Sequence, residues 1–314
     1  MFDSVLGAIG ETPLVAIDRM AEGLPARVAV KLEYYSPGGS VKDRVALRIL
    51  EDAERDGRLK PGGTVVELTS GNMGIGLAVV CAVKGYRMVA VMSEGNSVER
   101  RRVLEALGAR VELVPQVGGP RPGQVSAEDL QAVHERTDQL VAELGAFCPN
   151  QFENPSAVAA HDDTTGEEIW RQTEGKVTHF VASIGTGGTF VGTARALKRH
   201  NPNVLCYAAE PATAPFIAGQ PITNTSHKIQ GTGYALVPPL WQPELVDGLL
   251  TASDDEAIEV ARRLAKEEGI FGGFSTGANV ACAIELARSA PAGSLVVTLA
   301  PDTGLKYLST DLVE

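Results

Sequence analysis

The sequence predicts an α/β protein with two three-layer αβα lobes, each built on a mostly parallel twisted sheet. Short apolar runs alternate with helix-length periodic segments along most of the chain, and glycine-rich loops join several of these runs to the next helix. Parallel strands need crossovers of about this length, and helices on both faces then bury the sheet. A chain of 314 residues can bury one large core or two medium ones, and we expect two lobes.

Composition and charge exclude several function classes. Apolar residues make up 44% of the chain and charged residues 21%, as in ordinary globular proteins. The net charge of -11 disfavours binding to nucleic acid or to an anionic membrane. We find no apolar run of membrane-spanning length and no secretory signal at the N-terminus. Four widely separated cysteines lack metal-binding spacing, so we expect reduced thiols, no metal and a cytoplasmic protein: Cys81, Cys148, Cys206 and Cys282.

In the first half of the chain, turn residues separate the expected elements clearly. Gly57 and the turn at 60–63 end the first helix, and Gly108 closes a later one. The segment 115–124 holds three glycines and three prolines and reads as a surface loop of undefined role. We expect strands at 14–15, 27–32, 64–68, 87–92 and 110–114, and helices at 43–56, 74–84, 96–107 and 127–144.

The second half continues the same alternation. We expect helices at 157–172, 189–200, 254–268 and 276–288, and strands at 178–184, 204–209 and 294–299. The predicted smaller, mobile lobe comprises residues 44–146, and the larger lobe comprises 1–43 and 147–314.

Lys42 lies between a glycine-rich turn, residues 36–40, and the start of a helix. Lysines usually favour the other end of a helix, where the dipole is negative. An amine that is partly desolvated near a helix N-terminus shifts toward its neutral form, which is the form that makes a Schiff base with an aldehyde. For this motif alone, a solvated surface lysine is the alternative.

The loop Ile184–Thr189 follows an apolar strand and opens a helix. Its glycines allow successive backbone amides to point into one concavity at a positive helix end, which suits a phosphate group. A tight turn without a ligand is one alternative. A dinucleotide site is another: the glycine spacing and position do not fit it, but Glu210 lies where an acidic partner would be expected.

A third loop, Thr69–Gly74, also joins a strand to a helix. It gathers hydroxyls, an amide and a helix N-terminus at the carboxyl end of a strand, where parallel sheets bind ligands. These groups suit a carboxylate and a phenolic oxygen. An ordinary helix cap at Ser70 or Asn72 is the alternative.

Taken together, four motifs resemble the pyridoxal-phosphate enzymes of the cysteine synthase and cystathionine β-synthase family. Ser-x-x-x-Ser-Val-Lys-Asp-Arg, Thr-Ser-Gly-Asn-x-Gly, Gly-Thr-Gly-Gly-Thr and Gly-Phe-Ser-Thr-Gly-Ala occur in the family's order and spacing. The resemblance runs from Ile9 to Thr310 and is nearest to short bacterial cysteine synthases. It implies the tryptophan synthase β-subunit-like fold, known as fold type II, and a homodimer.

The resemblance assigns the cofactor roles. It implies that Lys42 forms the internal aldimine with pyridoxal 5'-phosphate and later removes the substrate's α-proton. Asn72 would bond the ring's 3'-oxygen, and Ser275 would face the pyridine nitrogen without enforcing its protonation. The cofactor phosphate would be held by Gly185, Thr186, Gly187, Gly188 and Thr189.

The substrate side resembles the family with two departures. Met73 replaces a usual threonine, and Tyr234 stands where a small residue is expected. These departures leave the substrate and the nucleophile open. The residues that the resemblance places around the substrate are Thr69, Ser70, Gly71, Met73, Gln151 and Gly231.

The implied reaction is β-replacement on O-acetyl- or O-phospho-L-serine through an α-aminoacrylate, with sulphide as the first expected nucleophile and cysteine as the product. The partners are thus a small amino acid and a small nucleophile. Two alternatives stay open: another nucleophile that gives a specialised β-substituted alanine, and dehydration of serine or threonine.

Overall fold

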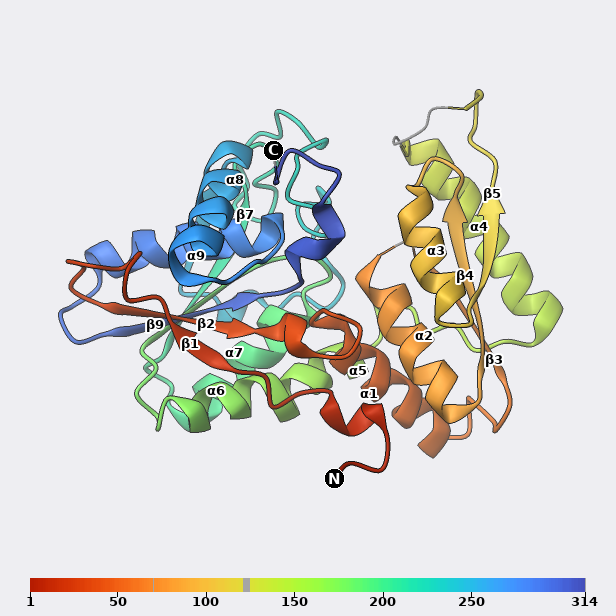
Figure 1. The fold of residues 1–314 in the computed structure, drawn as a ribbon, viewed down its shortest axis with the longest axis horizontal. Helices are drawn as coiled ribbons and strands as arrows, with labels where there is room; N and C mark the ends of the chain where they lie inside the picture. Colours follow the sequence, from red (N-terminus) through yellow and green to blue (C-terminus); the bar gives the residue numbers. More distant parts are fainter. Residues whose placement is uncertain (70, 121–124, 314) are drawn as a thin grey trace. The chain divides into compact units, whose positions relative to one another are not determined.

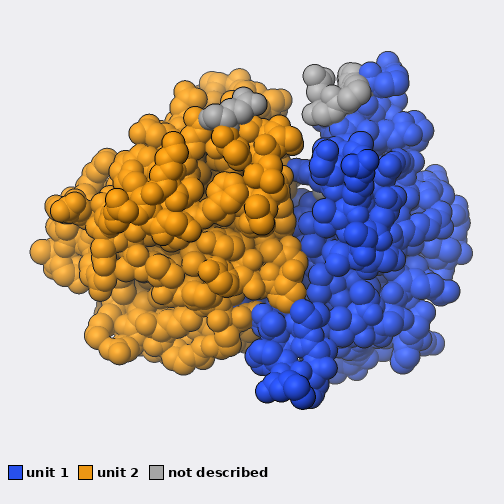
Figure 2. Space-filling view, viewed as in Figure 1, with its two compact units in different colours: residues 1–9, 42–156 blue, residues 10–41, 157–314 orange. Residues whose placement is uncertain are grey.

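The computed structural model describes residues 1–69, 71–120 and 125–313. The chain divides into two compact units, which Figure 2 colours separately. Unit 1 comprises Met1–Ile9 and Lys42–Ser156, and unit 2 comprises Gly10–Val41 and Ala157–Glu314. Compared with the expected smaller lobe, unit 1 gains residues 1–9, 42–43 and 147–156. Gln151 therefore belongs to the same unit as Asn72.

Unit 1 is built on a parallel three-stranded sheet in the order β3-β4-β5. Val133 and Leu140 of one helix, α4, form an apolar core with buried valines from all three strands: Val66, Val89, Val91 and Val114. Figure 1 shows α2 and α3 on the opposite face of this sheet from α4. The elements are η1 (Val5–Ala8), α1 (Lys42–Arg55), β3 (Thr64–Leu68), α2 (Asn72–Lys84), β4 (Arg87–Ser93), α3 (Val98–Ala106), β5 (Arg110–Val114) and α4 (Ala127–Leu144).

Local signals set the helix ends of unit 1. In α4, Ser126 accepts a hydrogen bond from the Asp129 amide, and the Asp129 carboxylate accepts one from the Ser126 amide. Gly145 ends α4 and Gly85 ends α2, both in the left-handed region that glycine adopts without strain. The structure confirms the predicted strands at 64–68 and 110–114 and the predicted helix at 127–144.

Unit 2 is built on a six-stranded sheet in the order β1-β2-β9-β6-β7-β8. One face packs against α9 and the other against α6 and α7, so the layers are those predicted. The strands are β1 (Leu14–Ala16), β2 (Arg27–Leu32), β6 (His179–Ser183), β7 (Leu205–Pro211), β8 (Gly248–Ala252) and β9 (Leu295–Ala300). The helices are α5 (Ser156–Ala160), α6 (Gly166–Gln172), α7 (Gly188–His200), α8 (Asp254–Arg263) and α9 (Phe274–Ser289).

The fold differs from the sequence prediction in an additional strand and in the continuity of two helices. The edge strand β8 was not predicted, because its half-exposed residues follow a long irregular segment. The sheet is mostly parallel, as predicted, with the edge strand β1 antiparallel to β2. Two predicted helices are not continuous α-helices, because π turns occupy η3 (His161–Thr165) and η5 (Leu264–Glu268).

Among the described residues, no helix has the length and apolarity needed to cross a bilayer. The four cysteines are free thiols. Three of them are buried, and Cys148 is partly exposed.

Candidate functional site

The turn before Lys42 is held firmly within unit 2. The Val41 amide donates to the Pro301 carbonyl at 2.8 Å, and Ser40 forms an isolated bridge with Asp302. Gly39 has a φ of +70°, which favours glycine at this position. Lys42 then opens α1 and begins the second segment of unit 1, Lys42–Ser156. The lysine is therefore delivered by a fixed turn, as the sequence predicts.

The first turn of α1 packs closely on α2. A Cβ atom on Gly76 of α2 would lie 3.1 Å from the Lys42 carbonyl oxygen and 3.2 Å from the Asp43 Cα atom. A larger residue at position 76 would therefore push the two helices apart by a few tenths of an ångström. Lys42 is partly exposed, but surrounding protein atoms desolvate its amine and lower its pKa to about 8. The neutral amine is consequently far more populated near neutral pH than in an ordinary lysine.

Thr69 folds back over the N-terminus of α2. Its Oγ1 atom accepts hydrogen bonds from the Gly74 amide at 2.9 Å and the Gly71 amide at 3.4 Å. A Cβ atom on Gly74 would lie 2.7 Å from the Thr69 Cγ2 atom, so this turn also depends on a glycine. The hydroxyl is thus used as an acceptor by the helix, and its own hydrogen can serve a ligand oxygen.

The neighbouring residues of this loop have different environments. Asn72 is the first residue of α2, and Gly71 is its N-cap. Met73 is 2% exposed and is part of the apolar interior. Ser70 lies outside the described residues.

Gln151 lies in a turn that is paired with β3. The Phe147 amide donates to the Thr64 carbonyl, and the Val66 amide donates to the Phe147 carbonyl, both at 2.9 Å. Asn150 then adopts a φ of +47°, an uncommon conformation for a residue with a side chain. The strand that ends in the Thr69 loop therefore also anchors the segment that carries Gln151.

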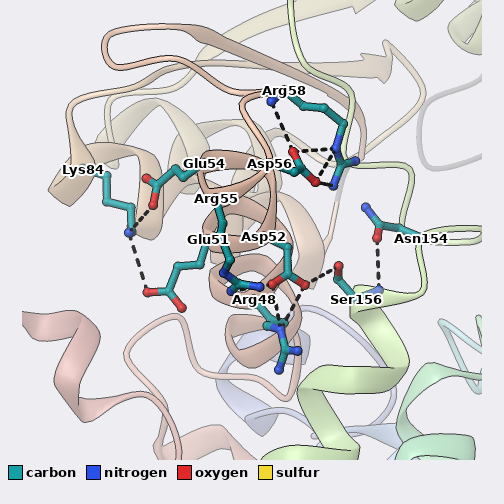
Figure 3. Close-up of polar contacts among 10 residues, drawn as sticks. All are labelled: Arg48, Glu51, Asp52, Glu54, Arg55, Asp56, Arg58, Lys84, Asn154 and Ser156. Carbon is teal, nitrogen blue, oxygen red and sulfur yellow. Dashed lines mark hydrogen bonds and ion pairs between the residues drawn. The ribbon is translucent and has the colours of Figure 1, made fainter.

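The other end of the Gln151 segment is fixed to α1. The Ser156 hydroxyl donates to Asp52 at 2.6 Å, and Asp52 also pairs with Arg48 at 2.9 Å and Arg55 at 2.7 Å (Figure 3). Burial opposes ionisation of Asp52, but the hydrogen bonds from Ser156 and Arg48 outweigh it and lower its pKa. Asn154 accepts from the Ser156 amide at 3.1 Å, so the segment is held at both ends within unit 1.

Sequence reasoning missed Glu67, a buried carboxyl in the middle of β3. It is 5% exposed, and burial raises its pKa to about 8 although the Asn150 amide donates a hydrogen bond to it. The pKa of the Cys148 thiol is raised to about 12, mainly by burial and to a smaller extent by the nearby Glu67. Both groups are therefore neutral near pH 7. The signal in the sequence is a single acidic residue in an otherwise apolar buried strand.

Glu67 should make the stability of the fold depend on pH. Its folded-state pKa lies above its unfolded value, so its contribution is full at low pH and is lost as pH rises toward 8. Between the ordinary glutamate pKa of 4.5 and the folded-state pKa of about 8, the wild type should lose up to about 1.4 kcal/mol of unfolding free energy per pH unit relative to Glu67→Gln. Urea unfolding between pH 5 and 9 measures the slope. Glu135→Gln on the exposed side of α4 is the control, and parallel slopes for wild type and Glu67→Gln would contradict the expectation.

In unit 2, the loop Gly185–Thr189 is packed tightly against the turn that carries Gly231. A Cβ atom on Gly185 would collide with the Gly231 carbonyl oxygen, and the Gly233 amide donates to the Ile184 carbonyl at 3.2 Å. Gly187 has a φ of +88° and is the N-cap of α7. The structure thus brings together two glycine motifs that lie far apart in the sequence.

This loop fits a phosphate group. The first amides of α7 have no partner within the helix, and the helix dipole makes its N-terminus positive. Residues 185–189 contain no acidic side chain that would repel an anion. The absence of Cβ atoms at three of these positions leaves the backbone accessible to a ligand's oxygen atoms.

Ser275 lies in the first turn of α9 and is 8% exposed. One turn later, Asn279 accepts from the Ser183 amide at 2.7 Å and donates to the Leu299 carbonyl at 3.0 Å. These bonds fix the start of α9 to the carboxyl ends of β6 and β9. The Gly185 loop follows β6, so Ser275 and this loop lie at the same edge of the sheet.

Glu210 does not serve a dinucleotide. It is 4% exposed in β7, and its two carboxylate oxygens accept from the amides of Ile217 and Ala218, each at 2.9 Å. Its carboxylate closes a turn instead. The alternative interpretation of the Gly185 loop therefore loses its acidic partner.

The predicted site residues divide between the two units. Unit 1 contains Lys42, Thr69, Gly71, Asn72, Met73 and Gln151, and unit 2 contains Gly185, Thr186, Gly187, Gly188, Thr189, Gly231 and Ser275.

Comparison with known proteins identifies the family. The family model described as "Pyridoxal-phosphate dependent enzyme" matches residues 5–302. The chain belongs to this family. It is a pyridoxal-phosphate-dependent enzyme of the cysteine synthase type, with the fold that the motifs imply.

Individual relatives are similar to this pyridoxal-phosphate enzyme in sequence and structure along almost its whole length. A cysteine synthase of Staphylococcus aureus (strain Mu50) is 44% identical over 311 residues, covering 99% of this chain and 96% of the relative. The crystal structure of an O-ureido-L-serine synthase has a TM-score of 0.91 and 42% identity, covering 99% of this chain and 95% of that one. O-acetyl serine sulfhydrylase isoform 3 from Entamoeba histolytica has a TM-score of 0.90 and 36% identity, covering 100% and 92%.

Proposed function

We propose that this enzyme replaces the β-substituent of an O-activated L-serine, acetylated or phosphorylated, with sulphide and so produces L-cysteine. The observation that carries the proposal is the 44% identity with a cysteine synthase over 99% of the chain. The fold shared with an O-acetyl serine sulfhydrylase supports the same reaction type.

The chain's residues fit the cofactor. When bound, pyridoxal phosphate supplies an electron-withdrawing ring that favours loss of the substrate's α-proton and β-leaving group. The Gly185–Thr189 loop would hold its phosphate, and Lys42 would bind it covalently. Asn72 would bond the ring's 3'-oxygen. The Ser275 hydroxyl would face the ring nitrogen, and it does not require that nitrogen to be protonated.

The remaining steps depend on proton transfer and on substrate orientation. With its pKa lowered to about 8 by burial, the Lys42 amine can both accept and return a proton near neutral pH. Thr69, Ser70, Gly71 and Gln151 would hold the substrate carboxylate. The amides at the N-terminus of α2 provide the positive end that favours this anion.

A second product class has a specific observation in its favour. The O-ureido-L-serine synthase is nearly as similar to this chain as the cysteine synthase is, and its name states a product other than cysteine. Incubating the enzyme with O-acetyl- and O-phospho-L-serine and a panel of nucleophiles, with the product mass read directly, tests both proposals. If cysteine forms far more slowly than another product does, the first proposal is rejected.

Replacing Met73 tests whether residue 73 affects the choice of nucleophile. Met73→Thr removes buried thioether packing and no catalytic group, so release of the leaving group should stay within about tenfold of wild type, or about 1.4 kcal/mol. Sulphide should gain relative to bulkier nucleophiles in the second half of the reaction. Stopped-flow measurement of each half-reaction in both proteins checks this. Identical preferences would make Met73 a packing substitution only.

We also propose that the enzyme is a cytoplasmic homodimer. A further proposal concerns motion: binding of the substrate carboxylate draws the Thr69 loop and α2 inward, so that unit 1 acts as the mobile lobe. The family resemblance supports both statements. Light scattering after size exclusion tests the dimer. Solution scattering with and without substrate tests the motion.

A further inference from the structure

His161 connects the loop assigned to the cofactor phosphate with a π turn behind it. The side chain is 0% exposed and begins the π turn His161–Thr165. Its Nδ1 atom lies 2.8 Å from the Thr165 hydroxyl oxygen, and its Nε2 atom lies 3.2 Å from the Thr189 hydroxyl oxygen. Thr189 is the last residue of that loop. A buried histidine thus contacts the side chain of the loop's last residue.

Close helix packing fixes the position of this imidazole. A Cβ atom on Gly192 of α7 would lie 2.7 Å from the His161 Cβ atom and would collide with the Val158 carbonyl oxygen. A Cβ atom on Gly166 would collide with the Cβ atom of Ala196. Two glycines therefore let the π turn lie directly against α7. A π turn widens a helix by one residue and often occurs at functional sites.

The chemistry of the three side chains selects one arrangement of protons when a phosphate is bound. Phosphate oxygens at neutral pH mainly accept hydrogen bonds, so the Thr189 hydroxyl must donate to them. Its oxygen can then accept from Nε2–H of His161. In a neutral imidazole the other nitrogen, Nδ1, must accept, and the Thr165 hydroxyl can donate to it. The result is one directed chain from Thr165 through His161 and Thr189 to the phosphate, in which each bond polarises the next.

We infer that His161 is a positioning residue for the cofactor phosphate, which holds the Thr189 hydroxyl in the donating orientation through its Nε2–H group. The inference rests on the proposed role of the Gly185–Thr189 loop. It assigns His161 no contact with substrate or cofactor. The π turn then has a function, because it places the imidazole between the two threonine hydroxyls.

Cofactor binding to the apoenzyme tests this inference. His161→Phe keeps an aromatic ring but removes both nitrogen contacts. It should weaken binding of pyridoxine 5'-phosphate, which lacks the aldehyde and cannot bond to Lys42, by about tenfold. The ³¹P resonance of the bound ligand should also shift. His161→Gln retains a donor near the Nε2 position and should recover most of the affinity.

A matched control is available within the same unit. His179 is also buried, at 7% exposure, and its Nδ1 atom lies 2.8 Å from the Thr178 hydroxyl, but no described hydrogen bond joins it to the loop. His179→Phe should therefore leave both the affinity and the ³¹P resonance unchanged. A loss of thermal stability in His161→Phe with neither readout altered would make His161 a packing residue and overturn the inference.

A double-mutant cycle with Thr189→Val separates the inference from the proposed function. Thr189→Val should weaken binding by itself, and His161→Phe should then add no further loss. If Thr189→Val weakens binding and His161→Phe does not, only the positioning role fails. If Thr189→Val leaves affinity and ³¹P resonance unchanged, the Thr189 hydroxyl does not bond the phosphate and the inference falls. The loop assignment itself rests on backbone amides and is tested separately by Gly187→Asp. Should His161→Phe not fold, ¹⁵N-histidine spectra of the wild-type holoenzyme decide, because protonation of His161 at Nδ1 alone would contradict the inference.

Discussion

Replacing Lys42 by alanine is expected to lower turnover by about a thousandfold or more and to remove the lysine-linked visible absorbance of the holoenzyme. The proposal gives this one amine two duties, covalent attachment of the cofactor and transfer of the α-proton. Loss of a positioned acid–base group alone costs about a hundred- to ten-thousandfold. The helix should survive, because alanine is a good helix former and the contact with Gly76 involves the backbone of residue 42.

The measurement for Lys42 combines spectra with chemical trapping. Borohydride reduction of the wild-type holoenzyme followed by peptide mapping should label the peptide that contains Lys42. Lys60→Ala, an exposed lysine in unit 1, should keep both absorbance and turnover. Labelling of a different lysine would overturn the assignment of the cofactor linkage.

Changing Gly187 to aspartate is expected to lower cofactor affinity by at least a hundredfold. The backbone of Gly187 has a φ of +88°, which strains residues with side chains by about 1–3 kcal/mol. The carboxylate would also place a negative charge at the helix end that is proposed to bind the phosphate. Cofactor content after dialysis and titration of the apoenzyme measure the loss.

Gly269 provides the control for backbone strain. It has a φ of +71° and open space around its Cβ position, and it ends a π turn in the same unit. Gly269→Asp should therefore show a comparable loss of stability with normal cofactor content. Full occupancy in Gly187→Asp would show that the phosphate binds elsewhere.

Much of the fold was predictable because its signals are local. The strand at 64–68 is a short apolar run between turn residues, and the helix at 127–144 has a capping box at its start and a glycine at its end. The glycine loops could likewise be placed at strand ends. Their pairing could not, because the packing of Gly185 on Gly231 joins segments with no periodic relation in sequence.

The missed features depend on tertiary structure. β8 has its ladder partner in β7 on one side only, and its alternating exposure is weak over five residues. The π turn at 161–165 adds one residue to a turn, which the average helical period conceals. In the sequence Glu67 is a single charged residue, and only the folded structure shows that the strand around it is buried. The contact of His161 with Thr189 exists only in the folded structure, where α7 lies beside the π turn.

The position of β9 in the larger sheet has a consequence for biosynthesis. β9 lies between β2 and β6 and pairs with both of them. A ribosome must therefore translate everything from Glu33 to Ser294 before β2 can acquire its parallel neighbour. Until then the apolar residues of β2 and β6 lack the strand that joins them, and such unpaired edges promote aggregation of nascent chains. Unit 1 closes earlier, once Ser156 has been made, so it can fold in full while most of unit 2 is still untranslated.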